Sequence, residues 1–149
     1  MVNLIDATVH HVAMSVKDID RALTFYRDLL GFEVDWDVDH RSGEAFSRLV
    51  GLLKADARVV MLKGYGLRVE LFQYYDPKGK FSEPRSQNDL GLTHFALSVK
   101  NIHQLWEKLL KAGVQFNCAP QNLRPGVWVT YMKDPEGVTI EVVQYELPG

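Results

Sequence analysis

A nine-residue phrase occurs twice in this chain of 149 residues and limits what the chain can fold into. Residues 11–19 read HVAMSVKDI and residues 94–102 read HFALSVKNI, so six of the nine positions are identical. A second phrase closes each copy: residues 66–74 read GLRVELFQY and residues 137–145 read GVTIEVVQY, with Gly, Glu, Gln and Tyr at equal spacing. Two copies are too few for a solenoid. The chain is therefore predicted to be a duplication of one small unit.

Each opening phrase leads into a helical pattern. Asp18 is the expected N-cap and Gly31 the stop in the first copy, and Asn101 and Gly113 have these positions in the second. Apolar residues between them follow the i, i+3, i+4, i+7 spacing of an amphipathic helix. The predicted stripes are Ile19, Ala22, Leu23, Tyr26, Leu29 and Leu30 in the first copy, and Ile102, Leu105, Trp106, Leu109 and Leu110 in the second.

Strand patterns complete each copy. Residues 34–39, 58–62, 114–116 and 127–132 read as strands, residues 44–52 as a short helix, and residues 134–137 as a hairpin turn. Each copy then has the order β-α-β-β-β. The predicted fold is α+β, a single domain over residues 1–149 made of two tandem βαβββ modules. The modules cover about residues 6–75 and 90–146, with a connector at about residues 76–89.

Composition excludes several classes of function. With 46% hydrophobic residues and a net charge of −2, the chain shows no basic stripe for nucleic acid or an anionic membrane surface. No apolar run reaches the roughly 18 residues that span a bilayer, and the first residues lack a signal-peptide pattern. We therefore expect a cytoplasmic protein that acts on a small molecule. The only cysteine, Cys118, is expected to be a small, partly buried apolar residue.

Strand alternation places four metal-binding side chains at matching positions, namely His11, Glu70, His94 and Glu141. Small residues alternate with apolar ones after each histidine, which leaves space in front of each imidazole. A carboxylate within an apolar strand is costly to bury unless it is paired or bound to a cation. Imidazole and carboxylate together suit a divalent ion such as Zn²⁺, Ni²⁺, Co²⁺, Mn²⁺ or Fe²⁺. One such ion is the expected cofactor; the alternative is that duplication alone preserved the four residues as strand-face contacts.

Other polar side chains are expected to be structural. His10 lies on the face opposite to His11 and is given no ligand role, and His40 and His103 are expected at the surface. The aspartates at positions 35, 37 and 39 are expected to form the solvated face of an edge strand.

Together these residues resemble the vicinal oxygen chelate superfamily, which includes glyoxalase I, methylmalonyl-CoA epimerase, extradiol dioxygenases, and fosfomycin and bleomycin resistance proteins. The resemblance covers nearly the whole chain and is carried by residues 11–19, by FYRDLLGF at 25–32, and by DPEG at 134–137 with Glu141. It implies that the sheets of the two modules curl into a cup around a metal, with ligands from the first and last strand of each. It also implies a homodimer, with the site inside one chain or shared by two.

Four good ligands, as in glyoxalase I and the epimerase, favour a lyase or isomerase that transfers a proton next to a metal-bound carbonyl. The substrate would have vicinal oxygens, and Glu141 or Glu70 would be the general base. Arg124 is a candidate for holding a substrate anion, although an exposed loop charge is the simpler interpretation. Phe72, Tyr74 and Trp128 are candidates for lining the cup, against plain packing. The alternatives are a ring-cleaving Fe(II) dioxygenase, in which one of the four ligands would not bind, and a small-molecule binding or resistance protein.

Overall fold

The computed structural model describes residues 5, 7–80 and 86–146. The chain divides into two compact units, Met1–Lys80 and Phe81–Gly149. Residues 81–85, in the middle of the predicted connector, lie outside the described residues, as do residues 1–4, 6 and 147–149 at the predicted ends of the domain. Within the described ranges, none of the helices has the length and apolar character needed to cross a lipid bilayer.

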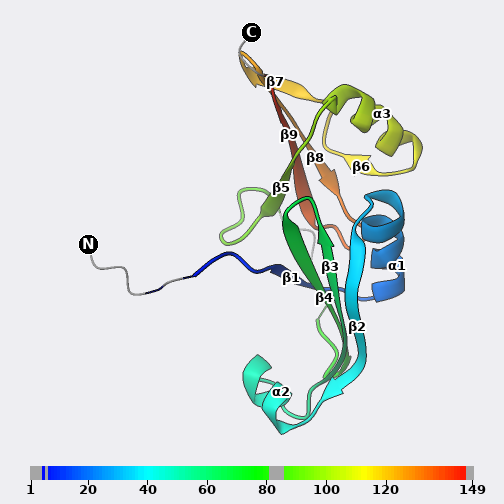
Figure 1. The fold of residues 1–149 in the computed structure, drawn as a ribbon, viewed down its shortest axis with the longest axis vertical. Helices are drawn as coiled ribbons and strands as arrows, with labels where there is room; N and C mark the ends of the chain where they lie inside the picture. The colour runs from blue at the N-terminus through cyan, green and yellow to red at the C-terminus, as the bar shows by residue number, and fades with distance from the viewer. Residues whose placement is uncertain (1–4, 6, 81–85, 147–149) are drawn as a thin grey trace. The chain divides into compact units, whose positions relative to one another are not determined.

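The first unit has the predicted β-α-β-β-β order with one inserted helix (Figure 1). Its elements are β1 (Val12–Ser15), α1 (Ile19–Leu23), the π-helical η1 (Thr24–Leu29), β2 (Glu33–Ser42), α2 (Glu44–Val50), β3 (Asp56–Gly64) and β4 (Leu67–Asp76). The strand order is β1-β4-β3-β2. β1 runs parallel to β4, and the other neighbours are antiparallel. The sheet is therefore mixed, and β2 is the edge strand that its alternating sequence predicts.

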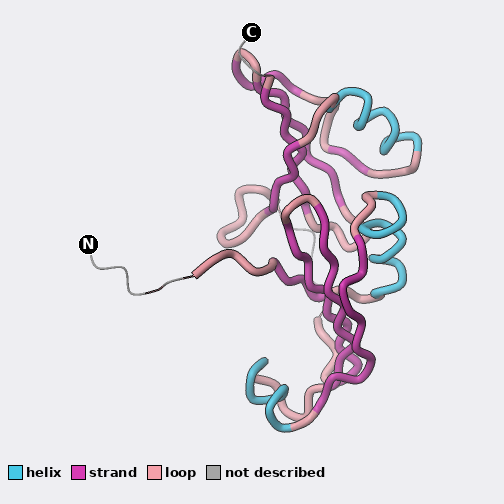
Figure 2. The backbone as a smooth tube through the Cα atoms, viewed as in Figure 1, coloured by secondary structure: helices cyan, strands magenta, loops and turns pink. Residues whose placement is uncertain are grey.

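The second unit repeats this plan in its own sheet, and Figure 2 shows the single helix beside the strands. Its elements are β5 (His94–Ser98), α3 (Ile102–Lys111), β6 (Gln115–Phe116), β7 (Gln121–Arg124), β8 (Val127–Lys133) and β9 (Thr139–Tyr145). The order is β5-β9-β8-β6, with β5 parallel to β9 and β7 paired to β8. β7 was expected to be loop; it forms because Gly126, at φ 77°, lets the chain turn back onto β8.

The recurring glutamine of the closing phrase has a structural role in both units. The side-chain oxygen of Gln73 on β4 accepts a hydrogen bond from the backbone N–H of Ile19, at 2.8 Å. Gln144 on β9 does the same for Ile102, at 2.7 Å. These N–H groups open α1 and α3 and have no partner within their helices. Each closing strand therefore holds the start of the helix that packs on its own sheet.

Two predictions about single residues are wrong. Asn101 precedes α3 as expected, but it has φ 57° and its side chain makes no capping hydrogen bond, whereas Asp18 accepts from Arg21 N. Gln144 takes over that role at α3. Cys118 is exposed rather than partly buried. The turn there is held through its backbone carbonyl, which accepts from the Thr130 hydroxyl at 2.7 Å.

The first helix departs from the predicted apolar stripe at its end. Leu29 is 37% exposed, whereas Phe25 is buried. The cause is the π-helical turn of η1, in which Leu30 N donates to Phe25 O five residues back and rotates the following side chains. In α3, Leu110 is also exposed. The fully buried residues that make up this side of the first sheet include Ile19, Tyr26, Val60, Leu62, Val69 and Leu71.

The three aspartates of β2 are paired rather than simply solvated. Each binds a basic or hydroxyl side chain from β3 or β4. The contacts are Asp35 with Arg68 (2.6 Å) and Lys63 (3.4 Å), Asp37 with Arg58 (2.7 Å), and Asp39 with Tyr75 (2.7 Å). Ion pairs and one hydrogen bond therefore tie this edge strand to β3 and β4.

Candidate functional site

The first unit brings its predicted histidine and glutamate together. His11 directly precedes β1, and Glu70 lies in β4 opposite Ala13 of β1. His11 Nε2 is 3.1 Å from Glu70 Oε2. The carboxylate side chain is 14% exposed and the imidazole 34%. The pair is therefore half-buried but reachable from solvent.

The second unit contains the matching pair. His94 opens β5, and Glu141 of β9 lies opposite Ala96. His94 Nε2 is 2.9 Å from Glu141 Oε2. Each half of the duplication thus builds an imidazole–carboxylate pair with nearly the same geometry.

The other ring nitrogen of His94, Nδ1, makes contacts that fix the orientation of the ring. Nδ1 lies 3.1 Å from Gln87 Oε1 and 3.0 Å from Thr93 Oγ1. Gln87 Nε2 donates to Thr139 Oγ1 at 2.8 Å, and the same hydroxyl accepts from Lys133 Nζ. Because an amide oxygen only accepts, Nδ1 must donate. Nε2 is then the ring nitrogen that faces the carboxylate oxygen of Glu141.

The equivalent nitrogen in the first unit has a different partner. His11 Nδ1 is 2.7 Å from His10 Nδ1, and the two rings meet edge to face. His10 therefore contacts the pair through His11, not through Glu70.

The spacing of both pairs fits a divalent ion. Two ligands at about 2.0–2.2 Å from a metal and at right angles to each other lie about 3 Å apart, close to the 3.1 and 2.9 Å of the pairs. Each unit can therefore offer two ligands. Across the described ranges, no group of three or more His, Cys, Asp or Glu side chains lies close enough to hold a metal. One pair alone is thus half of the expected ligand set.

A tyrosine accompanies each glutamate. Burial and then the negative charge of Glu70 raise the pKa of Tyr74. In the second unit burial and then Glu141 raise the pKa of Tyr131, which lies opposite Glu141 on β8. Its ring is 5.1 Å from that of His94. Sequence reasoning missed Tyr131, although the hairpin turn at residues 134–137 fixes the register and would have placed it opposite Glu141.

The four predicted substrate contacts fall in different places. Phe72 and Tyr74 alternate with Glu70 along β4, so all three share one face, and the two rings are 5.8 Å apart. Trp128 pairs with Gln144, on the α3 side of its sheet, and its ring lies 4.6 Å from that of His103. Arg124 is exposed at the end of β7. The structure thus brings Phe72 and Tyr74 to a glutamate and leaves Trp128 on the opposite face from Glu141.

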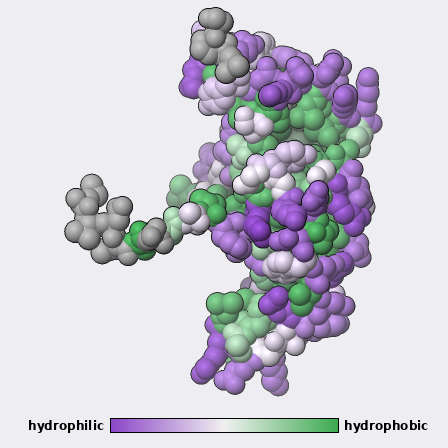
Figure 3. Space-filling view, viewed as in Figure 1, coloured by the Kyte–Doolittle hydropathy of each residue, from purple (hydrophilic) through white to green (hydrophobic). Residues whose placement is uncertain are grey.

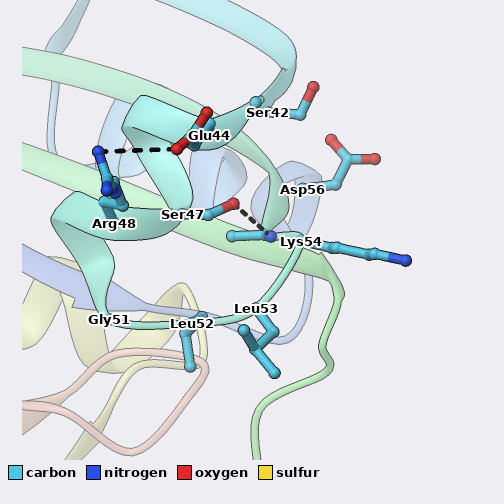
Figure 4. A pocket seen from close by; sticks show the side chains of 11 residues that line it. Ser42, Glu44, Ser47, Arg48, Gly51, Leu52, Leu53, Lys54 and Asp56 are labelled. Atoms are coloured by element: carbon cyan, nitrogen blue, oxygen red, sulfur yellow. Dashed lines mark hydrogen bonds and ion pairs between the residues drawn. The ribbon is translucent and has the colours of Figure 1, made fainter.

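A large hollow in the first unit lies away from these residues. It measures about 760 Å³ and is lined by residues 42–44, 47–48 and 51–56, which include parts of α2 and the loop that follows it. Figure 4 shows Glu44 and Arg48 paired across the helix, and Leu52 and Leu53 on the loop. None of the predicted site residues lines this hollow.

Comparison with known proteins matches this fold to a family. The family model described as Glyoxalase/Bleomycin resistance protein/Dioxygenase superfamily covers residues 8–142. The chain belongs to this superfamily. A 2-epi-5-epi-valiolone epimerase from Actinomyces is 31% identical to it, over 91% of this chain and 78% of that protein. A probable lactoylglutathione lyase from Synechocystis is 26% identical, over 90% of this chain and 92% of that protein.

Comparison with solved structures gives the same fold. A glyoxalase family protein from Bacillus cereus superimposes with a TM-score of 0.87 at 19% identity, covering 98% of this chain and 99% of that one. The predicted glyoxalase-like α+β fold is thereby confirmed. Membership places the chain among glyoxalase I-like enzymes, a superfamily whose members are generally metal-dependent.

Proposed function

We propose that this protein is a divalent-metal-dependent lyase or isomerase that transfers a proton at a carbon next to a carbonyl. The supporting observation is that each unit pairs a histidine Nε2 with a glutamate oxygen, at 3.1 and 2.9 Å. His11, Glu70, His94 and Glu141 are the proposed ligands of one ion, within one chain or between two chains of a homodimer. When bound, the ion supplies Lewis-acid stabilisation of negative charge on the substrate oxygen.

The residues of the chain supply the proton transfer. A carboxylate oxygen of Glu141 or Glu70 takes the proton from the substrate carbon and returns it, which is the role of a general base and then acid. His94 is held in one orientation by Gln87, so its Nε2 stays directed at Glu141. A substrate with vicinal oxygens would reach the half-buried carboxylates from the faces of β4 and β9 that carry Glu70 and Glu141.

Metal content tests the ligand set. The protein is loaded separately with Zn²⁺, Ni²⁺, Co²⁺, Mn²⁺ and anaerobic Fe²⁺, and bound metal is measured after dialysis. We expect one ion per chain, and loss of most of it in His11→Ala, Glu70→Ala, His94→Ala and Glu141→Ala. Matched controls are His103→Ala and Glu107→Ala, which alter exposed residues of α3. Unchanged metal content in the four pair variants would show that the proposed site is wrong.

Hydrogen exchange tests the reaction. The similar relatives suggest two compounds, 2-epi-5-epi-valiolone and S-lactoylglutathione. Metal-loaded protein in D₂O should exchange the hydrogen next to the carbonyl in a compound that it accepts, as followed by NMR. Oxygen consumption with catechols and no such exchange would support the dioxygenase alternative instead.

Three further proposals concern the domain, the oligomer and the location of the protein. We propose that the two units act as one domain, that the protein is a homodimer, and that it works in the cytoplasm. Light scattering with and without metal measures the oligomeric state directly.

A further inference from the structure

Three aromatic rings form a row that begins beside Glu70. Phe72 and Tyr74 follow Glu70 on the same face of β4, with ring centroids 5.8 Å apart and planes within 12°. Phe46 of α2 continues the row, 6.4 Å from Tyr74 and within 11°. Parallel rings at these separations are offset rather than face to face. Phe46 is buried, whereas Phe72 and Tyr74 are half-buried and pack against the cluster to which Phe46 belongs.

The surroundings of this row are apolar and include small side chains. Ala57 and Val59 of β3 lie beside Tyr74 and Phe72 on the same sheet face and are fully buried. On the other side, Ser15 of β1 lies opposite Phe72 and is exposed. A small exposed residue beside a large ring leaves room above the strand. The row is thus bounded by buried apolar side chains of β3 on one side and by the exposed Ser15 of β1 on the other.

Charged side chains lie near this row but not directly beside it. Glu70 stands at one end of the row. Arg41 of β2 is level with Tyr74 in the sheet register, and its guanidinium lies over the Trp36 ring of the same strand, 5.4 Å from the ring centroid. The side chains beside Phe72 and Tyr74 on β1 and β3 are uncharged. A ligand that extends from Glu70 along β4 would therefore meet aromatic side chains whose neighbours on β1 and β3 are uncharged.

The second unit lacks this row. The positions that match Phe72 and Tyr74 by the closing phrase are Val143 and Tyr145, and Tyr145 is 59% exposed. The second unit also has no helix between its strands that corresponds to α2. Figure 3 shows hydrophobic surface over α2, the helix that carries Phe46. The aromatic row is therefore an addition to one copy, not a feature of the duplicated plan.

We infer that this row binds the non-reacting part of the substrate, and that this part is a planar, uncharged, unsaturated ring. The inference rests on the proposed function, because Glu70 is taken as the end at which the reacting oxygens lie. The ring would lie on Phe72 and Tyr74 with Phe46 as the end wall.

Metal-free protein tests the ring site independently of the reaction. Benzamide and cyclohexanecarboxamide, which differ in planarity, are titrated while the NMR signals of Phe72, Tyr74 and Ser15 are followed. Stacking predicts roughly 2- to 10-fold tighter binding of benzamide at these residues. Equal binding of the two probes, or perturbation only elsewhere, would overturn the inference.

Conservative variants keep the test valid. Phe72→Leu with Tyr74→Leu retains apolar volume but removes the planar faces, and should abolish the preference for benzamide. Tyr145→Leu, at the matching position of the second unit, should leave it unchanged. Thermal unfolding of each variant shows whether it is folded. A preference that survives in the folded double variant contradicts the site.

A second arm separates this inference from the proposed function. Protein loaded with Ni²⁺ is titrated with benzohydroxamate and acetohydroxamate, two chelators with vicinal oxygens. The inference predicts tighter binding of the aromatic one, lost in the double variant. If the protein binds no Ni²⁺ but benzamide selects the row, the proposed metal function fails and the ring site stands. If both hydroxamates bind equally to loaded protein, the ring site fails and the metal function stands.

Discussion

The two imidazole–carboxylate pairs are alike in their donors and different in what supports them. His11–Glu70 and His94–Glu141 have almost the same separation. However, His11 Nδ1 faces an exposed histidine, His10, whereas His94 Nδ1 faces an amide and a hydroxyl that are partly buried. The duplication therefore preserved the two pairs, while the residues that contact their histidines diverged.

The residues facing the two carboxylates differ as well. Met61 lies opposite Glu70 on β3, and Tyr131 lies opposite Glu141 on β8. The strand paired with β4 thus places a thioether beside Glu70, and the strand paired with β9 places a phenol beside Glu141. The two pairs therefore have equal donors in unequal surroundings, and the predictions below test how unequal their effects are.

Replacing each carboxylate by its amide should have the largest effect. In Glu70→Gln and Glu141→Gln the shape is kept, but the general base is removed from one pair at a time. We expect the variant that lacks the base to lose hydrogen exchange by about 10²- to 10⁴-fold while it retains metal. The other should lose mainly metal affinity. Exchange rates and bound metal, measured together, distinguish the two; equal losses in both variants would show that the pairs are equivalent.

Removing the support of each histidine should have a smaller, unequal effect. Gln87→Ala frees His94 Nδ1, and loss of such an outer partner typically costs about 10- to 100-fold in metal affinity. His10→Ala should cost less, because its bond to His11 is exposed to water. Competition with a fluorescent chelator measures both, with Gln115→Ala, an exposed glutamine of β6, as control. A larger effect for His10→Ala would reverse the comparison.

The sequence was sufficient for the features that recur in it. The repeated phrases predicted the βαβββ order, and strand alternation placed Glu70, Phe72 and Tyr74 on one face. What it missed depends on contacts between distant residues. Gln87 lies in the predicted connector, and nothing local shows that it reaches His94.

Two other differences between the predictions and the structure come from strand register and helix geometry. Trp128 and Tyr131 are three residues apart, so strand alternation puts them on opposite faces, and the pairing of β8 with β9 shows that Tyr131 shares the face of Glu141. The exposure of Leu29 follows from a π-helical turn that an i, i+3, i+4 pattern cannot reveal.

The matched glutamines should affect stability equally. Gln73→Ala and Gln144→Ala each remove the acceptor for the first N–H of a helix, at 2.8 and 2.7 Å. Loss of a comparable capping bond costs about 1 kcal/mol of unfolding free energy. Urea unfolding at neutral pH measures both, and Gln121→Ala, an exposed position of β7, is the control. A large difference between the two variants would show that the units do not share this support.

The smallest expected effect on stability concerns His40, a residue of the first unit. His40 Nδ1 lies 2.8 Å from Asp56 Oδ2, and no histidine occupies the corresponding end of β6 and β8. The hydrogen bond and then the charge of Asp56 raise the pKa of His40 above its ordinary value of 6.5, with a smaller contribution from Asp39. Tyr75 also faces this ring, at 4.8 Å.

Because the folded pKa of His40 is the higher one, its pairing stabilises the fold fully below about pH 6.5, while Asp56 remains ionised, and this stabilisation disappears as pH rises through the folded value. His40→Gln should therefore lower the unfolding midpoint slightly at pH 6 and not at pH 9. An NMR titration should show the pKa of His40 falling toward 6.5 in Asp56→Asn. If the variant and the parent differ equally at both pH values, the contribution of His40 comes from packing against Tyr75 instead of from its charge.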